Sequence, residues 1–205
     1  MKHLLVLIFL AIETFCDAQS YEEAVDKCTQ TFQLGLDPNN IKELESKMEQ
    51  NLVELRKCMI GLKFPSFTAT TIDNKTYTLN DLRRKVVLIN LWFIGCPPCV
   101  AEIPMFNELQ NEFSRKDFII LSFGLDDNKS IEEFIKKQPI NFSVFANSEN
   151  LISNKFKMSF GYPTNIFLDQ DRQIIEFTTG GAMDVVGLKK TKEELKNLIK
   201  RELGK

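Results

Sequence analysis

The sequence predicts a mixed α/β fold in which helices flank a central sheet. Residues 86–93 (VVLINLWF) and 118–123 are almost continuously apolar, which is typical of strands buried on both faces of a sheet. Helical periodicity follows each of these segments, over residues 96–113 and 131–137. Strands that alternate with helices in this way indicate a sheet covered by helices.

The remaining elements of the sheet domain are predicted from periodicity and turn residues. Asp73 and Asn74 form a turn signal between two short strand patterns, so we expect a β-hairpin there. In chain order, the expected elements are the hairpin strands 67–71 and 76–79, a strand over 142–145, a helix over 151–156, a closing hairpin of 164–169 and 173–178, and a charged helix over 192–203.

Residues 20–60 are predicted to form a helical segment ahead of the sheet. Apolar residues recur at helical spacing in two stripes, with a break at residues 35–38 and an end at Gly61. Cys28 and Cys58 are expected to form a structural disulfide, which would contribute roughly 3–4 kcal/mol by closing a loop of about thirty residues. However, two helices in a simple antiparallel hairpin would leave these cysteines roughly 15 Å out of register. Two buried free cysteines are therefore the alternative.

Residues 1–18 have the pattern of a secretory signal peptide. The apolar run at residues 4–12 is too short to span a bilayer as a helix, but it fits the hydrophobic region of such a signal, with cleavage after Ala18. A buried N-terminal helix or strand is one alternative. Lipid attachment at Cys16 is another, and the residues that precede it disfavour this. We therefore expect an extracytoplasmic protein, periplasmic in a bacterium.

Composition excludes several classes of function. The formal net charge is −2, and no basic excess points to nucleic acid or anionic lipid. The single histidine, His3, would leave with the signal peptide, which excludes Cys–His and Ser–His–Asp catalysis and metal sites that need imidazole. We predict neither a metal nor a cofactor. Four cysteines would remain, an even number that is typical of disulfide chemistry in exported proteins.

The motif Cys96-Pro97-Pro98-Cys99 lies where a predicted buried strand meets a predicted helix. Cys96 falls at the N-cap, and the two prolines fall in the first turn, where amide groups have no helical partner. The helix dipole and free amides favour a thiolate on Cys96, which could attack a disulfide. Cys99 would then resolve the mixed disulfide. The catalytic prediction is therefore a redox pair of Cys96 and Cys99.

Three other functions compete with this interpretation. The pair could form a purely structural disulfide, or it could bind zinc or copper as part of a carrier module. A four-cysteine zinc site would need Cys28 and Cys58, which form no second CxxC motif. A peroxidase would need a Pro-x-x-x-Thr/Ser-x-x-Cys context, which neither cysteine of the pair has.

Five short motifs between Gly61 and the C-terminus carry a resemblance to a known family. They are GLKFPSF (61–67), KVVLINLW (85–92), CPPC (96–99), EIP (102–104) and YPTNIF (162–167). With these motifs the sequence resembles the TlpA/ResA branch of the thioredoxin superfamily, which are bacterial periplasmic thiol–disulfide oxidoreductases. The implied organisation is a signal peptide at 1–18, a helical appendage at 19–60 and a thioredoxin-like domain at 61–205.

The resemblance also implies partners and a direction of electron flow. It favours a reductant that acts on disulfide-bearing exported proteins, such as apocytochrome c, and is recharged by a membrane thiol donor. The family usually has tryptophan before the first cysteine, whereas this sequence has Gly95, which flattens the surface that would face a client.

Client-binding residues are predicted around the cysteine pair. The resemblance implies a cis proline at Pro163 facing the disulfide, and such a bond would present the backbone of Tyr162 to an extended client segment. An ordinary trans proline is the alternative. Pro97 and Pro98 complete this surface. Trp92 is expected to pack beneath the site and to help shape the client-facing side.

Glu102 is the predicted proton acceptor. It follows Cys99 by three residues on the same helical face, and the resemblance implies that it lies near the cysteine pair. A partly buried carboxyl with a raised pKa could accept the proton of the resolving thiol. Asn90 stands where cytoplasmic thioredoxins have a buried aspartate, so that position cannot shuttle a proton. The alternatives are a solvated surface role for Glu102 and a satisfied core amide for Asn90.

Overall fold

The computed structural model describes residues 21–29 and 41–204. The predicted signal peptide and Cys16 lie outside the described residues. Residues 21–29 are helical. The further elements are α2 (Ile41–Met59), β1 (Thr68–Thr70), β2 (Thr76–Thr78), η1 (Leu79–Leu82), β3 (Val86–Trp92), α3 (Pro97–Glu112), β4 (Phe118–Gly124), α4 (Asn128–Lys137), β5 (Ser143–Phe145), η2 (Leu151–Lys155), β6 (Thr164–Leu168), β7 (Ile174–Thr179) and α5 (Val185–Leu203).

The central sheet has five strands in the order β5-β4-β3-β6-β7, and β1 and β2 form a separate hairpin. β3 pairs in parallel with β4 and antiparallel with β6, so the sheet is mixed. Every residue of β3 and β4 is buried, as their continuous apolar runs predict. The predicted fold class, a mixed sheet flanked by helices with an N-terminal hairpin and helical appendage, is confirmed.

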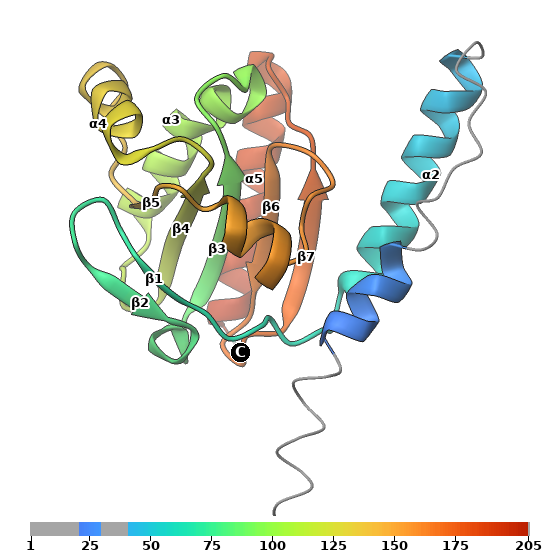
Figure 1. Cartoon of the computed structure of the whole chain (residues 1–205), viewed down its shortest axis with the longest axis horizontal. Coiled ribbons are helices and arrows are strands. Elements are labelled where there is room, and N and C mark those ends of the chain that lie inside the picture. The colour runs from blue at the N-terminus through green and yellow to red at the C-terminus, as the bar shows by residue number, and fades with distance from the viewer. Residues whose placement is uncertain (1–20, 30–40, 205) are drawn as a thin grey trace, which may run out of the picture.

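The sheet separates two hydrophobic cores, because successive side chains of a strand point to opposite faces. The front core lies under the β1–β2 hairpin and η2, and it takes Val87, Ile89 and Leu91 from β3 (Figure 1). The rear core lies under α3 and α5, which pass behind the sheet in the same view. Cys28 belongs to the front core, whereas Cys96 and Cys99 belong to the rear core.

The closing helix α5 begins earlier than the sequence predicts, at Val185 rather than at residue 192. The side chain of Asp184 accepts a hydrogen bond from the Gly187 amide at 2.9 Å, which is an N-cap. Val185 and Val186 are exposed, so the first turns have no core-facing stripe that periodicity could detect.

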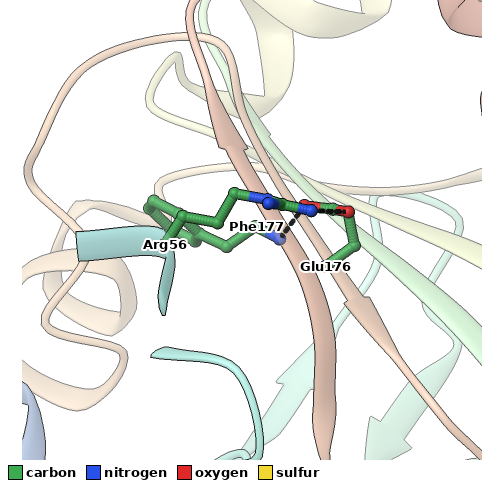
Figure 2. Close-up of polar contacts among 3 residues, drawn as sticks. All are labelled: Arg56, Glu176 and Phe177. Atoms are coloured by element: carbon green, nitrogen blue, oxygen red, sulfur yellow. Dashed lines mark hydrogen bonds and ion pairs between the residues drawn. The ribbon is translucent and has the colours of Figure 1, made fainter. Parts of the chain in front are cut away.

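The N-terminal helices are attached to the body at one end of α2. Tyr21 is buried and donates its hydroxyl to the carbonyl oxygen of Phe156 at 2.8 Å. Arg56, near the end of α2, forms an ion pair with Glu176 of β7 (Figure 2). The Phe177 amide donates to the same carboxylate. The first half of α2 projects away from the sheet (Figure 1). Within the described ranges, none of the helices is long and apolar enough to cross a bilayer.

Cys28 and Cys58 form a disulfide with a Cα–Cα distance of 5.7 Å. The register objection to this bridge is therefore wrong for this chain. It assumed a rise of about 1.5 Å per residue throughout both segments. The described helical residues 21–29 and Ile41–Met59 nevertheless bring Cys28 and Cys58 within disulfide distance.

Candidate active site around Cys96 and Cys99

Cys96 and Cys99 lie at the junction of β3 and α3 and are joined by a disulfide in this structure. Cys96 is the N-cap of α3, with extended backbone, and Pro97 and Pro98 open the helix. The Cys99 amide donates a hydrogen bond to Cys96 Sγ at 3.3 Å. The sequence places each of these residues correctly, because proline is tolerated in a first helical turn.

Solvent exposure does not distinguish the two cysteines, since Cys96 is 4% exposed and Cys99 is 3% exposed. The difference between them is electrostatic. Cys96 Sγ lies at the end of α3 and receives a backbone N–H, and both features stabilise a thiolate there. Cys99 lies inside the first turn and receives no such bond within the described part of the chain. The arrangement therefore favours a thiolate on Cys96 once the disulfide is reduced.

Tyr162 and Pro163 lie beside the strand end that leads to Cys96. The peptide bond between them is cis, as the resemblance implies. β6 runs antiparallel to β3, with Thr164 opposite Leu91, so the residues just before Thr164 adjoin those just after Leu91. The rings of Phe93 and Tyr162 accordingly meet edge to face at 5.5 Å. Tyr162 is partly exposed at this position and Pro163 is buried.

Trp92 packs beneath the site, as the sequence predicts. The side chain is 1% exposed and packs against Phe134, with a ring separation of 5.6 Å, in the rear core. It can therefore shape the client-facing side only through the residues that pack against it, and not by direct contact. The position looked like part of the site because it is four residues before Cys96, but it is the inward-facing end of a strand buried on both faces.

Glu102 is a buried carboxyl, not a solvated surface residue. It is 2% exposed, and Asn165 Nδ2 donates to its Oε2 at 3.1 Å. Burial raises the pKa of Glu102 to about 7, and the hydrogen bond from Asn165 opposes that rise. Gly181 leaves room for the carboxyl, because a Cβ built there would lie 3.0 Å from both Glu102 Oε1 and Pro163 Cγ. The carboxyl of Glu102 and the ring of Pro163 therefore both pack closely against Gly181.

Asn90 is a hydrogen-bonded core amide, which is the alternative that the sequence left open. It donates to Asn165 Oδ1 at 2.9 Å and accepts from the Ser122 hydroxyl at 2.7 Å. Sequence reasoning missed Ser122, Asn165 and Gly181. A signal for the first two exists, since each is a polar residue within an otherwise apolar strand. The hydrogen bonds of Ser122 and Asn165 to Asn90, and of Asn165 to Glu102, depend on strand order, which periodicity does not report.

An open pocket of about 870 Å³ reaches Glu102. Glu102 and Asn165 line its floor, and neither Cys96 nor Cys99 lines it. The charged residues of its wall come from α2, β7 and α5: Arg56, Glu176, Glu194 and Arg201. The buried carboxyl therefore borders a pocket that the disulfide does not line.

The four cysteines do not come together as one site. They form two disulfides, and the two pairs belong to cores on opposite faces of the sheet. A four-cysteine zinc centre would need all four sulfurs within about 2.3 Å of one ion. Among the residues that the structure describes, no group of three or more His, Cys, Asp or Glu side chains could hold a metal.

Comparison with known proteins identifies the class to which this fold and disulfide belong. Residues 60–177 match the AhpC/TSA family model, and the chain belongs to this thioredoxin-like family. Thiol-disulfide oxidoreductase ResA of Bacillus cereus is 27% identical over 146 residues, which cover 71% of this chain and 79% of the relative. Thioredoxin-like protein YneN of Bacillus subtilis is 26% identical over 144 residues, covering 69% and 80%.

Solved structures agree on the fold. A DsbE-type thiol:disulfide interchange protein of Chlorobium tepidum superimposes with a TM-score of 0.61 at 23% identity, covering 70% of this chain and 97% of that one. The family match and the sequence relatives place the chain in the TlpA/ResA-like branch. The protein is a thiol–disulfide oxidoreductase with a thioredoxin-like fold.

Proposed function

We propose that Cys96 and Cys99 are the redox pair of this oxidoreductase. The observation that carries the proposal is the position of their disulfide at the N-terminus of α3, where Cys96 Sγ accepts a backbone amide. In the reduced protein, the Cys96 thiolate attacks one sulfur of a client disulfide. That S–S bond breaks, the released client thiolate takes up a proton, and a mixed disulfide links Cys96 to the client.

The second step returns the pair to its oxidised form. The Cys99 thiol loses its proton and attacks Cys96 Sγ, which releases the second client sulfur as a thiolate. Two electrons have then passed from the pair to the client disulfide. Glu102 is the proton acceptor in this proposal, because its pKa of about 7 lets it take up and release a proton near neutral pH. The pocket that Glu102 lines, and that neither cysteine lines, supports proton exchange with solvent while a client covers the cysteines.

The proposal extends to location, domains and clients. Residues 61–205 would be the catalytic domain and residues 19–60 a helical appendage, with residues 1–18 removed on export from the cytoplasm. Clients would be exported proteins with disulfides, apocytochrome c among them, and a membrane thiol donor would recharge the pair. Pro97, Pro98 and Tyr162 would contact the client directly, whereas the buried Pro163 would act through the backbone beside it. The backbone beside Pro163 can pair with an extended segment, in the manner of an added strand.

A direct test uses insulin, whose disulfides report generic thiol–disulfide exchange. We expect the purified chain to accelerate dithiothreitol-driven reduction of insulin, measured as precipitation of its B chain, because the pair passes electrons in two steps. A variant with both Cys96 and Cys99 replaced by serine is the control, since it retains the Cys28–Cys58 bridge. Equal rates with the two proteins would rule the proposal out.

Substitution of Glu102 by glutamine tests the proton acceptor. The carboxylate disfavours a second anion nearby, so Glu102→Gln should lower the apparent pKa of at least one active-site cysteine, measured by thiolate absorbance. Loss of a general base should slow turnover, by up to about a hundredfold. Glu108→Gln, an exposed change on the same helix, is the control. Superimposable titrations and equal turnover would show that Glu102 takes no part.

The same variant should change how stability depends on pH. Folding raises the Glu102 pKa from 4.5 to about 7, so the stability tied to its neutral form is complete below about pH 4.5 and is lost as pH rises through 7. The loss amounts to about 3 kcal/mol at most. Glu102→Gln should remove this pH-dependent loss. In urea unfolding, the free energy of unfolding of the variant should therefore rise relative to that of the parent chain between pH 4.5 and 8.

A further inference from the structure

Three buried polar side chains on neighbouring strands form a continuous chain that ends at Glu102. Asn90 on β3 stands opposite Ser122 on β4 and opposite Asn165 on β6. All three are at most 4% exposed and lie on the sheet face that α3 covers. Successive hydrogen bonds of 2.7, 2.9 and 3.1 Å link Ser122 to Asn90, Asn90 to Asn165 and Asn165 to Glu102. These hydrogen bonds thus connect Ser122 on β4, through β3 and β6, to the carboxyl of Glu102.

The chain has a direction. The Ser122 hydroxyl donates to Asn90 Oδ1, which turns Asn90 Nδ2 towards Asn165 Oδ1. That bond occupies the acceptor end of Asn165 and leaves its Nδ2 facing both carboxyl oxygens of Glu102, at 3.1 and 3.4 Å. An amide NH₂ can only donate, so it stabilises the ionised carboxylate and offers no acceptor to a protonated one.

We propose that Asn165 is a positioning residue, aimed by Asn90 and Ser122, that holds the Glu102 carboxylate ionised and ready to take the Cys99 proton. This inference rests on the proposed function. Burial by itself favours the neutral carboxyl, which has no capacity left to accept a proton. The donor from Asn165 offsets part of that burial penalty, and the two bonds behind it keep the amide from turning its oxygen towards Glu102.

Other charged and titratable groups near Glu102 must be separated from this effect. Cys99 precedes it by one turn on α3. Arg56 of α2, Glu176 of β7, and Glu194 and Arg201 of α5 line the pocket that it shares. Arg56 is paired with Glu176, and Arg201 with Glu202. The pKa of Glu102 is set by burial, which raises it, and by the Asn165 bond, which lowers it.

The test is a pH titration of Glu102 in the oxidised full-length protein, where neither cysteine pair titrates. The readout is the ¹³C shift of the side-chain carboxyl, assigned by its loss in Glu102→Gln. We expect Asn165→Leu, which has nearly the same shape but no donor, to move the titration upward by about one pH unit or more. The pH midpoint of insulin reduction should move in the same direction.

Two further variants separate positioning from packing. Ser122→Ala touches Asn90 but not Glu102, so it should move the Glu102 titration upward by a smaller amount. Gln110→Leu is the matched control, because Gln110 is a buried amide two turns further along α3 that bonds to Phe118 and Ile120 of β4. It should leave the titration unchanged.

An unchanged Glu102 titration in Asn165→Leu, or an equal shift in Gln110→Leu, would overturn the proposal. If Asn165→Leu fails to fold, an unchanged titration in Ser122→Ala would overturn it as well. Because the carboxyl shift is read in the oxidised protein without turnover, it remains informative even if the insulin test shows that Cys96 and Cys99 are not the redox pair.

Discussion

Substitution of Cys99 by serine is expected to leave stable mixed disulfides between Cys96 and client proteins, whereas Cys96→Ser should leave none. The reason is the position of each sulfur. Cys96 lies at the N-terminus of α3 and receives a backbone N–H, which supports its proposed role as the attacking thiol. Without Cys99, nothing in the pair can resolve the intermediate. Turnover should fall at least about a hundredfold in both variants, since each removes a member of one catalytic unit.

The measurement is non-reducing electrophoresis of each variant after incubation with oxidised insulin, followed by mass analysis of the linked peptides. A serine variant at both positions controls for exchange through Cys28 and Cys58. Alkylation of the reduced parent chain at neutral pH gives an independent reading, and Cys96 should react first. Faster modification of Cys99, or conjugates formed only by Cys96→Ser, would reverse the assignment of the two roles.

Loss of the Cys28–Cys58 bridge should lower the free energy of unfolding by about 3–4 kcal/mol, since the bridge closes a loop of some thirty residues in the unfolded chain. Cys58→Ser is the variant of choice because Cys58 is exposed, so its replacement leaves no cavity. Cys28, in contrast, is 2% exposed in the front core. Urea unfolding of the oxidised proteins measures the difference.

Exchange activity provides the control for this variant. The bridge and the Cys96–Cys99 pair belong to cores on opposite faces of the sheet, so Cys58→Ser should reduce insulin at the parent rate below its unfolding transition. A variant that unfolds like the parent but loses activity would contradict a structural role. It would instead show that the bridge takes part in electron transfer.

The sequence by itself determined the elements and the position of the disulfide. Residues of β3 and β4 had to be apolar throughout, because both faces of a central strand are buried, and that requirement is visible as an unbroken run. Within a helix, the two prolines between Cys96 and Cys99 fit best in the first turn, which placed the motif at the start of α3. These are local constraints, and a local pattern is sufficient to read them.

Only the tertiary structure decided which residues meet. Glu102 could be placed on a helix but not in a core, because a single glutamate carries no record of what covers it. Its pairing with Asn165 depends on β6 lying next to β3, although 63 residues separate the two side chains. The bridge between Cys28 and Cys58 likewise depends on where the helix of residues 21–29 lies relative to α2, and Trp92 lies inside because β3 ends facing the rear core. Strand order and helix packing arise from burial summed over the whole chain, so no short window of sequence contains them.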